Sequence, residues 1–521
     1  MATKIVLKNS ILLRYLPGIV LFLTMACPVY SANFPLEIIL PKAAGAGSPA
    51  IPSTYPIFRA YPGVEYNIRA AVIGGAYPYR FALTNQPSGM TINASTGEIV
   101  WRNPQSSSGN ITLAVTDSEG ATVSTSWTIT VTTNGFLFVN SSYSGPQTGT
   151  IDQPFNSIAS LLQNSGSGNG NDIVYFRAGN YQLIAFNSVY EATGVQGCNL
   201  DGRPHMWIGY PGEIVNINGD GRFFEITNLY FDRLNLSNFS DYGIRADSGS
   251  HYDLMRRCKL SNVTAVRSSN SNQGFYFTQA TSTGYYWVFQ DNEFSNFTGA
   301  SAIGSIYDRE KFLIENNYIH DPGGSGLNGV SNAIALKYRC NYGTVRGNII
   351  RMSSGMILGN SLNGSFVHSN NNEICFNFFD AGVGGVHRFN THGPTEPMLR
   401  TYYYRNTVIG DIIFQNINGS NCAAQGPFYL YNNVIINSTS SSYTKENHIT
   451  YHYTCTDTPQ NCISQSNNLT GTPENNIIDI NGNLTPAYRS FLGTRGYQLG
   501  GKNGPMTPSS PKGLSISQAQ Y

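Results

Sequence analysis

The sequence has few charged side chains, and that scarcity excludes some classes of protein. Only 12% of its 521 residues are charged, and 31 Lys and Arg nearly balance 30 Asp and Glu. Nucleic acid is therefore not expected as a partner, because its binding needs a basic surface that contacts phosphates. Beyond the first 31 residues, no apolar run approaches the ~20 residues needed to cross a bilayer. We expect no transmembrane segment.

Cysteine is also scarce, and its spacing does not indicate a zinc site. The chain has 8 cysteines and no CxxC pair. In an oxidising compartment, disulfides are expected in the loop-like C-terminal region, between Cys455 and Cys462 or from Cys422 to one of them. Three others lie within or beside expected strands and could equally be small buried hydrophobic residues: Cys258, Cys340 and Cys375.

Residues 1–31 have the order of a secretory signal peptide. Three cationic residues come first, then the apolar run at residues 19–23, then small residues before Ala32. We expect cleavage after Ser31, with Cys27 leaving a lipoprotein as an alternative. The mature chain is expected to be secreted, to the extracellular space or cell surface, with the periplasm as an alternative.

What the sequence does contain is a short repeated phrase. The motif consists of an apolar residue, two or three polar residues and an apolar pair. Its asparagines lie 25, 31, 29, 29 and 27 residues apart, at Asn292, Asn317, Asn348, Asn377, Asn406 and Asn433. A regular period with short strands indicates a solenoid. Asparagine tolerates the left-handed conformation at corners, and stacked side chains can hydrogen-bond along the axis. We interpret these asparagines as structural.

Residues 33–133 are expected to form a separate β-sandwich, because alternating apolar strands are separated by turn clusters. PSGMTINASTGEIVWRNP at residues 87–104 and ITLAVTDSEGATVSTSWTITV at residues 111–131 resemble Ig-like or dystroglycan-type cadherin-like domains of bacterial surface and secreted proteins. That resemblance implies a spacer or adhesive module. Asp117 and Glu119 could supply ligands to calcium or form a solvated turn. No other cofactor is expected.

Residues 136–181 begin a second unit. The run FLFVNSSYSGPQTGTIDQPFNSIASLLQNSGSGNGNDIVYFRAGNY resembles the opening of right-handed parallel β-helix proteins of the pectate-lyase-like superfamily. The matching features are a first strand, a GT…PF turn, a short capping helix at residues 155–163, and a strand that ends in Gly-x-Tyr. We therefore predict an all-β chain with a right-handed parallel β-helix at residues 135–490. Residues 491–521 are expected to be a C-terminal extension.

The best candidate for a functional rung is NAIALKYR at residues 332–339. Alternation places Ile334 and Leu336 inward and Lys337 outward, beside small alanines that would leave room for a substrate. Counting rungs brings further residues into approximate register with Lys337: Tyr307 or Asp308, Asn360, His387 or Arg388, and Gln415.

This inventory fits β-elimination on a polysaccharide that contains uronic acid. The expected roles are Lys337 as base, Arg388 as the group that neutralises the carboxylate, and His387 or Tyr307 as proton donor. An acidic polysaccharide is therefore the expected partner, and the oligomeric state is left open.

A second resemblance points the same way. AIALKYRCNYGTVRGNII is similar to a lysine-bearing rung of β-helix lyases of the alginate lyase and chondroitinase B type. It implies Lys337 as base, with Thr344, Arg346 and Asn348 in the turn. The sequence departs from that family at residues 356–360, MILGN, which lack the arginine of the next rung. A triad of calcium-binding acids is not evident either.

Two alternatives remain open. A glycoside hydrolase would need two facing carboxylates, for which Asp308 and Asp321 are the pair nearest the expected groove. A non-catalytic adhesin or carbohydrate-binding protein would need only amides and aromatic rings. Aromatic runs at residues 285–287 and 402–404 could serve it, or could pack in the core.

Overall fold

The computed structural model describes residues 32–470 with internal gaps. The gaps are residues 166–171, 188–193, 204, 241–242, 247–248, 265–273, 279–282, 299–300, 322–331, 353, 359–368, 381–385, 392–399, 410, 417–427, 432, 437–448, 453–462 and 467–468. In several strands the backbone is described but the side chains are not. Cys422, Cys455, Cys462 and Asn360, which figured in the sequence predictions, lie outside the described residues.

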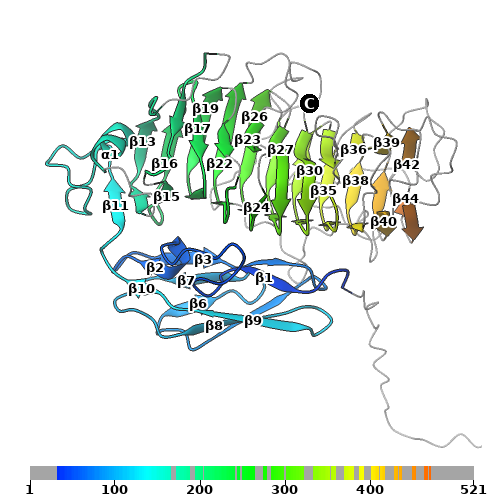
Figure 1. The fold of residues 1–521 in the computed structure, drawn as a ribbon, viewed down its shortest axis with the longest axis horizontal. Coiled ribbons are helices and arrows are strands. Elements are labelled where there is room, and N and C mark those ends of the chain that lie inside the picture. Colours follow the sequence, from blue (N-terminus) through cyan, green and yellow to red (C-terminus); the bar gives the residue numbers. More distant parts are fainter. Residues whose placement is uncertain are drawn as a thin grey trace, which may run out of the picture.

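The predicted all-β architecture is confirmed. An elongated solenoid lies alongside a smaller sandwich, which packs against one of its faces (Figure 1). Within the described residues, helix is limited to η1 (Pro56–Phe58) and α1 (Ile158–Asn164). Helix α1 starts at the N-cap Ser157, whose side chain accepts a hydrogen bond from the Ser160 amide. It covers the first rungs, as a cap on the open end of the solenoid should.

The sandwich is built from short antiparallel strands. Their alternation is clearest in β8, where Ile111, Leu113 and Val115 are fully buried between partly exposed neighbours. The strands are β1 (Glu37–Leu40), β2 (Arg59–Ala60), β3 (Tyr66–Arg69), β4 (Ala71–Ile73), β5 (Arg80–Thr84), β6 (Met90–Ile92), β7 (Glu98–Trp101), β8 (Ile111–Thr116), β9 (Thr122–Trp127) and β10 (Thr130–Val131). They pair as β3-β7-β6, β5-β8-β9 and β1-β4, while β10 pairs with β2 in parallel.

The solenoid consists of three parallel sheets, so it is a parallel β-helix, with the right-handed sense that such crossovers adopt. Sheet 1 contains β11 (Phe136–Val139), β12 (Ile173–Phe176), β15 (Met206–Gly209), β18 (Tyr230–Asp232), β21 (Leu254–Arg256), β25 (Val288–Gln290), β28 (Leu313–Glu315), β31 (Thr344–Arg346), β34 (Glu373–Cys375), β37 (Thr401–Tyr404), β40 (Phe428–Tyr431) and β43 (Ile463–Ser466).

Sheet 2 contains β13 (Gly179–Gln182), β16 (Val215–Asn218), β19 (Asn235–Ser240), β22 (Lys259–Thr264), β26 (Glu293–Thr298), β29 (Tyr318–His320), β32 (Ile349–Arg351), β35 (Phe378–Asp380), β38 (Thr407–Ile409), β41 (Val434–Ile436) and β44 (Leu469–Thr470). Sheet 3 contains β14 (Gly197–Asn199), β17 (Phe223–Ile226), β20 (Ile244–Ala246), β23 (Gly274–Thr278), β24 (Gly284–Tyr285), β27 (Ser301–Glu310), β30 (Asn332–Asn341), β33 (Ser354–Leu358), β36 (Val386–Thr391), β39 (Asp411–Asn416) and β42 (Ile449–His452).

The six repeated asparagines form a buried ladder at the corner between sheets 1 and 2. At each step the backbone amide and Nδ2 of one asparagine donate to Oδ1 of the next, as from Asn317 to Asn348 at 2.9 Å each. Nδ2 also donates to a main-chain carbonyl, such as Phe289 O. The structural interpretation is confirmed, but the left-handed conformation belongs to the preceding residue, for example Asn316 at φ 55° and Gly347 at φ 68°.

The Ig-like domain covers the outer face of sheet 1 and does not stand apart as a spacer. Tyr55, Ile57 and Ile68 of the domain share one apolar cluster with outward residues of sheet 1, including Leu254 and Val288. At the rim, corner residues of the β-helix pair with the domain. Lys311 binds Glu37, Arg257 binds Glu98, and Tyr252 donates to carbonyls of residues 46 and 49.

A column of buried polar side chains on sheet 1 binds one segment of the domain. The column runs in register through Asp232, Arg256, Gln290, Glu315 and Arg346. Three of its members donate hydrogen bonds to main-chain carbonyls that are spaced along the segment containing β3 and β4. Arg256 donates to Asn67 O at 2.7 Å, Gln290 to Ala70 O at 3.2 Å, and Arg346 to Val72 O at 3.1 Å. The contacts therefore fix which rung faces which residue of the domain.

The charges of this column are paired within the interface. Arg69 of the domain binds Asp291 and Glu315, and Glu315 also binds Arg346 at 2.7 Å. Burial raises the pKa of Glu315, but Arg346 and Arg69 outweigh it, so this pKa lies below its ordinary value. Asp232 behaves in the same way beside Arg256, and its pKa is strongly lowered.

The N-terminal segment of the described chain extends the interface along the β-helix. Asn33 Nδ2 donates to Glu373 Oε1 at 3.0 Å and to the Tyr431 hydroxyl at 2.9 Å, and the Phe34 ring meets Tyr402 edge-on. Glu373 is only 2% exposed. Burial raises the pKa of Glu373 to about 7, against the lowering effect of its hydrogen bonds to Asn33 and Tyr404 and of the nearby Arg346.

Glu373→Gln should therefore change how stability depends on pH. The folded-state pKa of Glu373 lies above the unfolded value of 4.5, so its ionisation costs stability progressively from about pH 4.5 to 7. The amide cannot ionise, so the variant should gain up to roughly 3 kcal/mol relative to wild type between pH 4 and pH 8. Urea unfolding of both proteins across this range measures the difference. A gap between them that does not change with pH would contradict the assignment.

Candidate functional site

The four residues proposed from the sequence all lie on sheet 3. Tyr307 is in β27, Lys337 is in β30, and His387 and Arg388 are in β36, so the four span the consecutive strands β27, β30, β33 and β36. Their backbone is described, but their side chains lie outside the described part of the structure. The roles assigned to them remain predictions.

Strand pairing gives the register that sequence counting could only approximate. Leu336 pairs with Leu358, which pairs with Phe389, which pairs with Phe414. The residues that follow these partners, Asn390 and Gln415, therefore lie in the column of Lys337.

Arg388 lies in a different column. It pairs with Ile357 and, through it, with Ala335. Arg388 is thus two rungs from Lys337 and two residues back, which places the two Cα atoms about 12 Å apart.

The alanines of this rung do not provide the space that we expected beside Lys337. Ile334 and Leu336 point into the core as predicted, but Ala333 and Ala335 are also fully buried. Among the described side chains of β30, those that are partly exposed lie toward its C-terminal end, at Arg339 and Asn341.

That end of the strand carries a charged pair that the sequence did not single out. Asp308 in β27 and Arg339 in β30 sit at matching positions, between the pair Tyr307–Tyr338 and the pair Arg309–Cys340. Both have left-handed backbone, with φ of 53° and 46°. Arg339 binds the Asp308 carboxylate through Nε and Nη2. The carboxylate is fully buried, whereas the Arg339 side chain is 41% exposed.

The carboxylate pair considered for hydrolysis is not brought together. Asp308 lies in sheet 3 and is ion-paired, whereas Asp321 follows β29 in sheet 2 and binds His320 Nδ1 at 2.7 Å. Nε2 of His320 contacts Glu293, which also pairs with Lys259. Burial lowers the pKa of His320, but its contacts to Glu293 and Asp321 prevail and raise it. His320 is thus held in an ion-pair ladder on sheet 2.

The aromatic runs are divided between the core and the domain interface. Trp287 and Tyr403 point into the β-helix, and Tyr286 packs on Tyr252 beneath the Ig-like domain. Tyr402 remains partly exposed and stacks on Tyr429, with ring centroids 4.6 Å apart. Both lie on sheet 1, so they do not contribute to the face that carries Lys337.

Asp117 has its carboxylate occupied by the main chain. Its two oxygens accept hydrogen bonds from the amides of Ala76, Glu119 and Ala121. Glu119 instead accepts from the amide of Ala32. Asp117 therefore stabilises a turn, and in the described ranges no cluster of three or more His, Cys, Asp or Glu residues could hold a metal ion.

The described cysteines are buried thiols. Cys198, Cys258, Cys340 and Cys375 are free, and burial raises the pKa of each to about 12. They behave as small core residues, which was the alternative left open for the last three. Their high pKa values and their burial make them poor nucleophiles.

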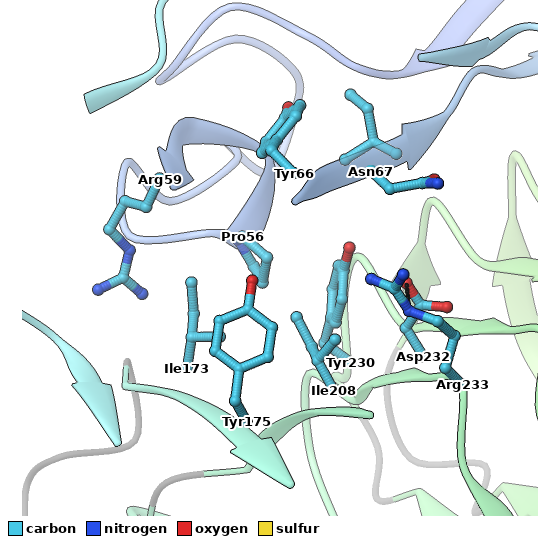
Figure 2. Close-up of a pocket in the computed structure, with 11 residues that line it drawn as sticks. Pro56, Arg59, Tyr66, Asn67, Ile173, Tyr175, Ile208, Tyr230, Asp232 and Arg233 are labelled. Atoms are coloured by element: carbon cyan, nitrogen blue, oxygen red, sulfur yellow. Dashed lines mark ion pairs between the residues drawn. The ribbon is translucent and has the colours of Figure 1, made fainter. Parts of the chain in front are cut away.

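A pocket at the domain interface is too small for a sugar. Figure 2 shows it between the Ig-like domain and sheet 1, with Tyr66 and Asn67 above and Tyr175, Tyr230 and Arg233 below. Its cavity volume of about 20 Å³ holds one water molecule. The Ig-like domain thus covers much of the outer face of sheet 1, whereas the candidate residues lie on sheet 3.

These features define the class of protein: an Ig-like domain packed along a right-handed parallel β-helix. A family described as "Putative Ig domain" matches residues 48–132. No curated protein matches the chain.

Two solved structures are similar over most of the chain. A rhamnogalacturonan lyase has 12% identity and a TM-score of 0.35, covering 70% of this chain and 99% of its own. The family 28 exopolygalacturonase of Yersinia enterocolitica has 11% identity and a TM-score of 0.27, covering 79% and 97%. Both TM-scores lie below 0.5, so the likeness says nothing about the activity of this chain.

No helix in the described ranges is long and apolar enough to cross a membrane.

Proposed function

We propose that this protein is secreted and binds an acidic polysaccharide along the outer face of sheet 3, where it cleaves the chain as a lyase. The observation that carries the proposal is the placement of Tyr307, Lys337 and Arg388 on three strands, β27, β30 and β36, that lie within four consecutive strands of one sheet. Successive strands about 4.8 Å apart offer a polymer a repeated row of contacts. Much of the outer face of sheet 1 is covered by the Ig-like domain.

The proposed reaction is β-elimination. Lys337, as the neutral amine, removes the C5 proton of a uronate whose carboxylate is neutralised by an arginine, Arg388 in the first assignment. The electron pair of the broken C–H bond forms the C4=C5 double bond as the glycosidic C4–O bond breaks. Tyr307 is the proposed proton donor to the leaving oxygen, because His387 directly precedes Arg388 in β36 and strand alternation assigns the two residues to opposite faces. One glycosidic bond is lost, and an unsaturated uronate end is produced.

Lys337→Ala should separate cleavage from binding. With the base removed, we expect the rate of cleavage to fall by about 10²- to 10⁴-fold, while the affinity for the glycan changes little. The assay follows the ultraviolet absorbance of unsaturated ends with alginate, pectate and chondroitin as substrates. Lys259→Ala is the matched control, because Lys259 is a partly exposed lysine on sheet 2.

The outcomes distinguish the proposal from its alternative. Cleavage that is unchanged in Lys337→Ala would reject the base but keep the class of reaction. Binding without cleavage by the wild-type protein would favour the non-catalytic carbohydrate-binding function. Neither binding nor cleavage across the panel would reject the proposed function.

A further inference from the structure

We propose that Arg339 binds the carboxylate of the sugar held at Lys337, and that Asp308 positions Arg339 for this role. The inference rests on the proposed function and deepens it, since it assigns a substrate-binding residue and requires a carboxylate on the glycan. It starts from an unusual feature of sheet 3, where β27 and β30 each place one left-handed residue at the same position, Asp308 and Arg339.

The placement of Arg339 follows from the strand. Arg339 follows Lys337 by two residues in β30, so their Cα atoms lie within about 7 Å of each other across the register shift at Lys337. That spacing is comparable to one sugar ring. Arg388 is two rungs away, with its Cα atom about 12 Å from that of Lys337, so Arg339 is the nearer arginine.

The two partners of this ion pair differ strongly in exposure. At the domain interface, Arg256–Asp232 and Arg346–Glu315 bury both side chains, at 2% and 1% and at 3% and 7%, and Arg257 beside the same Asp232 is 22% exposed. In Arg339–Asp308 the carboxylate is 0% exposed and the guanidinium 41%. The buried anion thus holds a cation that remains open to solvent.

The geometry of the guanidinium leaves it able to bind a second anion. Asp308 occupies the Nε and Nη2 side, and among the described residues it is the only ion-pair partner of Arg339. Arginine has five donors in a planar fork, so the Nη1 side can bind a carboxylate. A guanidinium fixed in this way loses little rotamer freedom on binding, which favours affinity.

The test compares glycans that differ only in the carboxylate. Polygalacturonate, alginate and unsulfated chondroitin are each titrated calorimetrically beside their methyl-esterified forms. The wild-type protein should prefer the free acid of the glycan that it binds. Arg339→Ala should weaken binding of that acid by about 10- to 100-fold and leave the ester unchanged. Arg339→Lys should recover part of the loss, and Asp308→Asn should weaken binding of the acid while Arg339 is still present.

Arg222→Ala is the matched control, since Arg222 also binds an aspartate, Asp220, at the surface between sheets 2 and 3. Thermal melting of each variant verifies that it is folded. If the wild-type protein prefers the acid and Arg339→Ala keeps that preference, the inference is overturned and the proposed function stands. If the wild-type protein binds no acidic glycan, both are overturned. Where cleavage occurs, a rise in KM with the acid substrate further supports the inference, and an unchanged KM opposes it.

Discussion

Arg346→Met should uncouple the Ig-like domain from the β-helix. Arg346 is 2% exposed, and it donates to Glu315 Oε1, to the Tyr79 hydroxyl and to Val72 O. Its guanidinium also lies 4.6 Å from the centre of the Tyr77 ring. Removing one partner of a buried ion pair leaves the other charge poorly compensated, so we expect a loss of about 3 to 5 kcal/mol in the free energy of unfolding.

The measurement is differential scanning calorimetry, with limited proteolysis of the linker at residues 132–135. In the wild-type protein, the interface and the β-helix should unfold in one transition. In the variant, the linker should become accessible to protease at a lower temperature than in the wild type. Arg177→Met is the matched control, because Arg177 pairs closely with Glu213 but is 36% exposed, and exposed pairs contribute little. Glu315→Gln added to Arg346→Met should restore part of the loss, because it removes the uncompensated charge. A loss below 1 kcal/mol would contradict the proposed role of Arg346.

The sequence predicted the β-helix because its repeat has a direct physical cause. Each rung needs one apolar residue that points inward on sheet 1, such as Phe289, Ile314 and Val345, followed by the ladder asparagine at the corner. That pattern recurs at each rung and can be read from the chain alone. The same holds for the helix that caps the first rungs, since an open end of a solenoid must be covered.

The docking of the Ig-like domain could not be predicted from the same pattern. Arg256, Glu315 and Arg346 occupy outward positions of their strands, where charged residues normally face water. Only the complementary residues of the domain, Arg69 above all, show that these positions are buried. The resemblance of residues 344–348 to a lyase rung placed Arg346 in a turn, whereas its side chain binds the Ig-like domain.

The sequence grouped the four candidate residues, which do share sheet 3, but it did not give their register. Rung lengths vary because loops differ, and register shifts occur where β27 pairs with β30 and where β33 pairs with β36. The left-handed positions of Asp308 and Arg339 also interrupt the regular strand geometry. Sequence spacing therefore aligned Lys337 with Arg388, whereas strand pairing places Arg388 two rungs away and in the column of Ala335.

Asn348→Ala should be among the most destabilising single substitutions within the β-helix. Its backbone amide and Nδ2 donate to Asn377 Oδ1, Nδ2 also donates to Ile314 O, and Oδ1 accepts two hydrogen bonds from Asn317. Asn348 is fully buried, so water cannot replace these partners. Each orphaned group costs about 1 to 3 kcal/mol, and we expect a total loss of about 4 kcal/mol or more.

The matched control uses a second, partly exposed row of asparagines on sheet 2. Asn216 Nδ2 donates to Asn180 Oδ1 at 3.0 Å, and Asn216 Oδ1 accepts from Asn235 at 2.9 Å. Water can satisfy these groups after Asn216→Ala, so the same chemical change there should cost about 1 kcal/mol or less. Urea unfolding followed by circular dichroism compares the two variants with wild type. The hydrogen bonds are of the same kind in both rows, so burial should account for a difference of about 3 kcal/mol between the two losses in free energy of unfolding. Equal losses would show that the buried ladder contributes no more to stability than surface amides do.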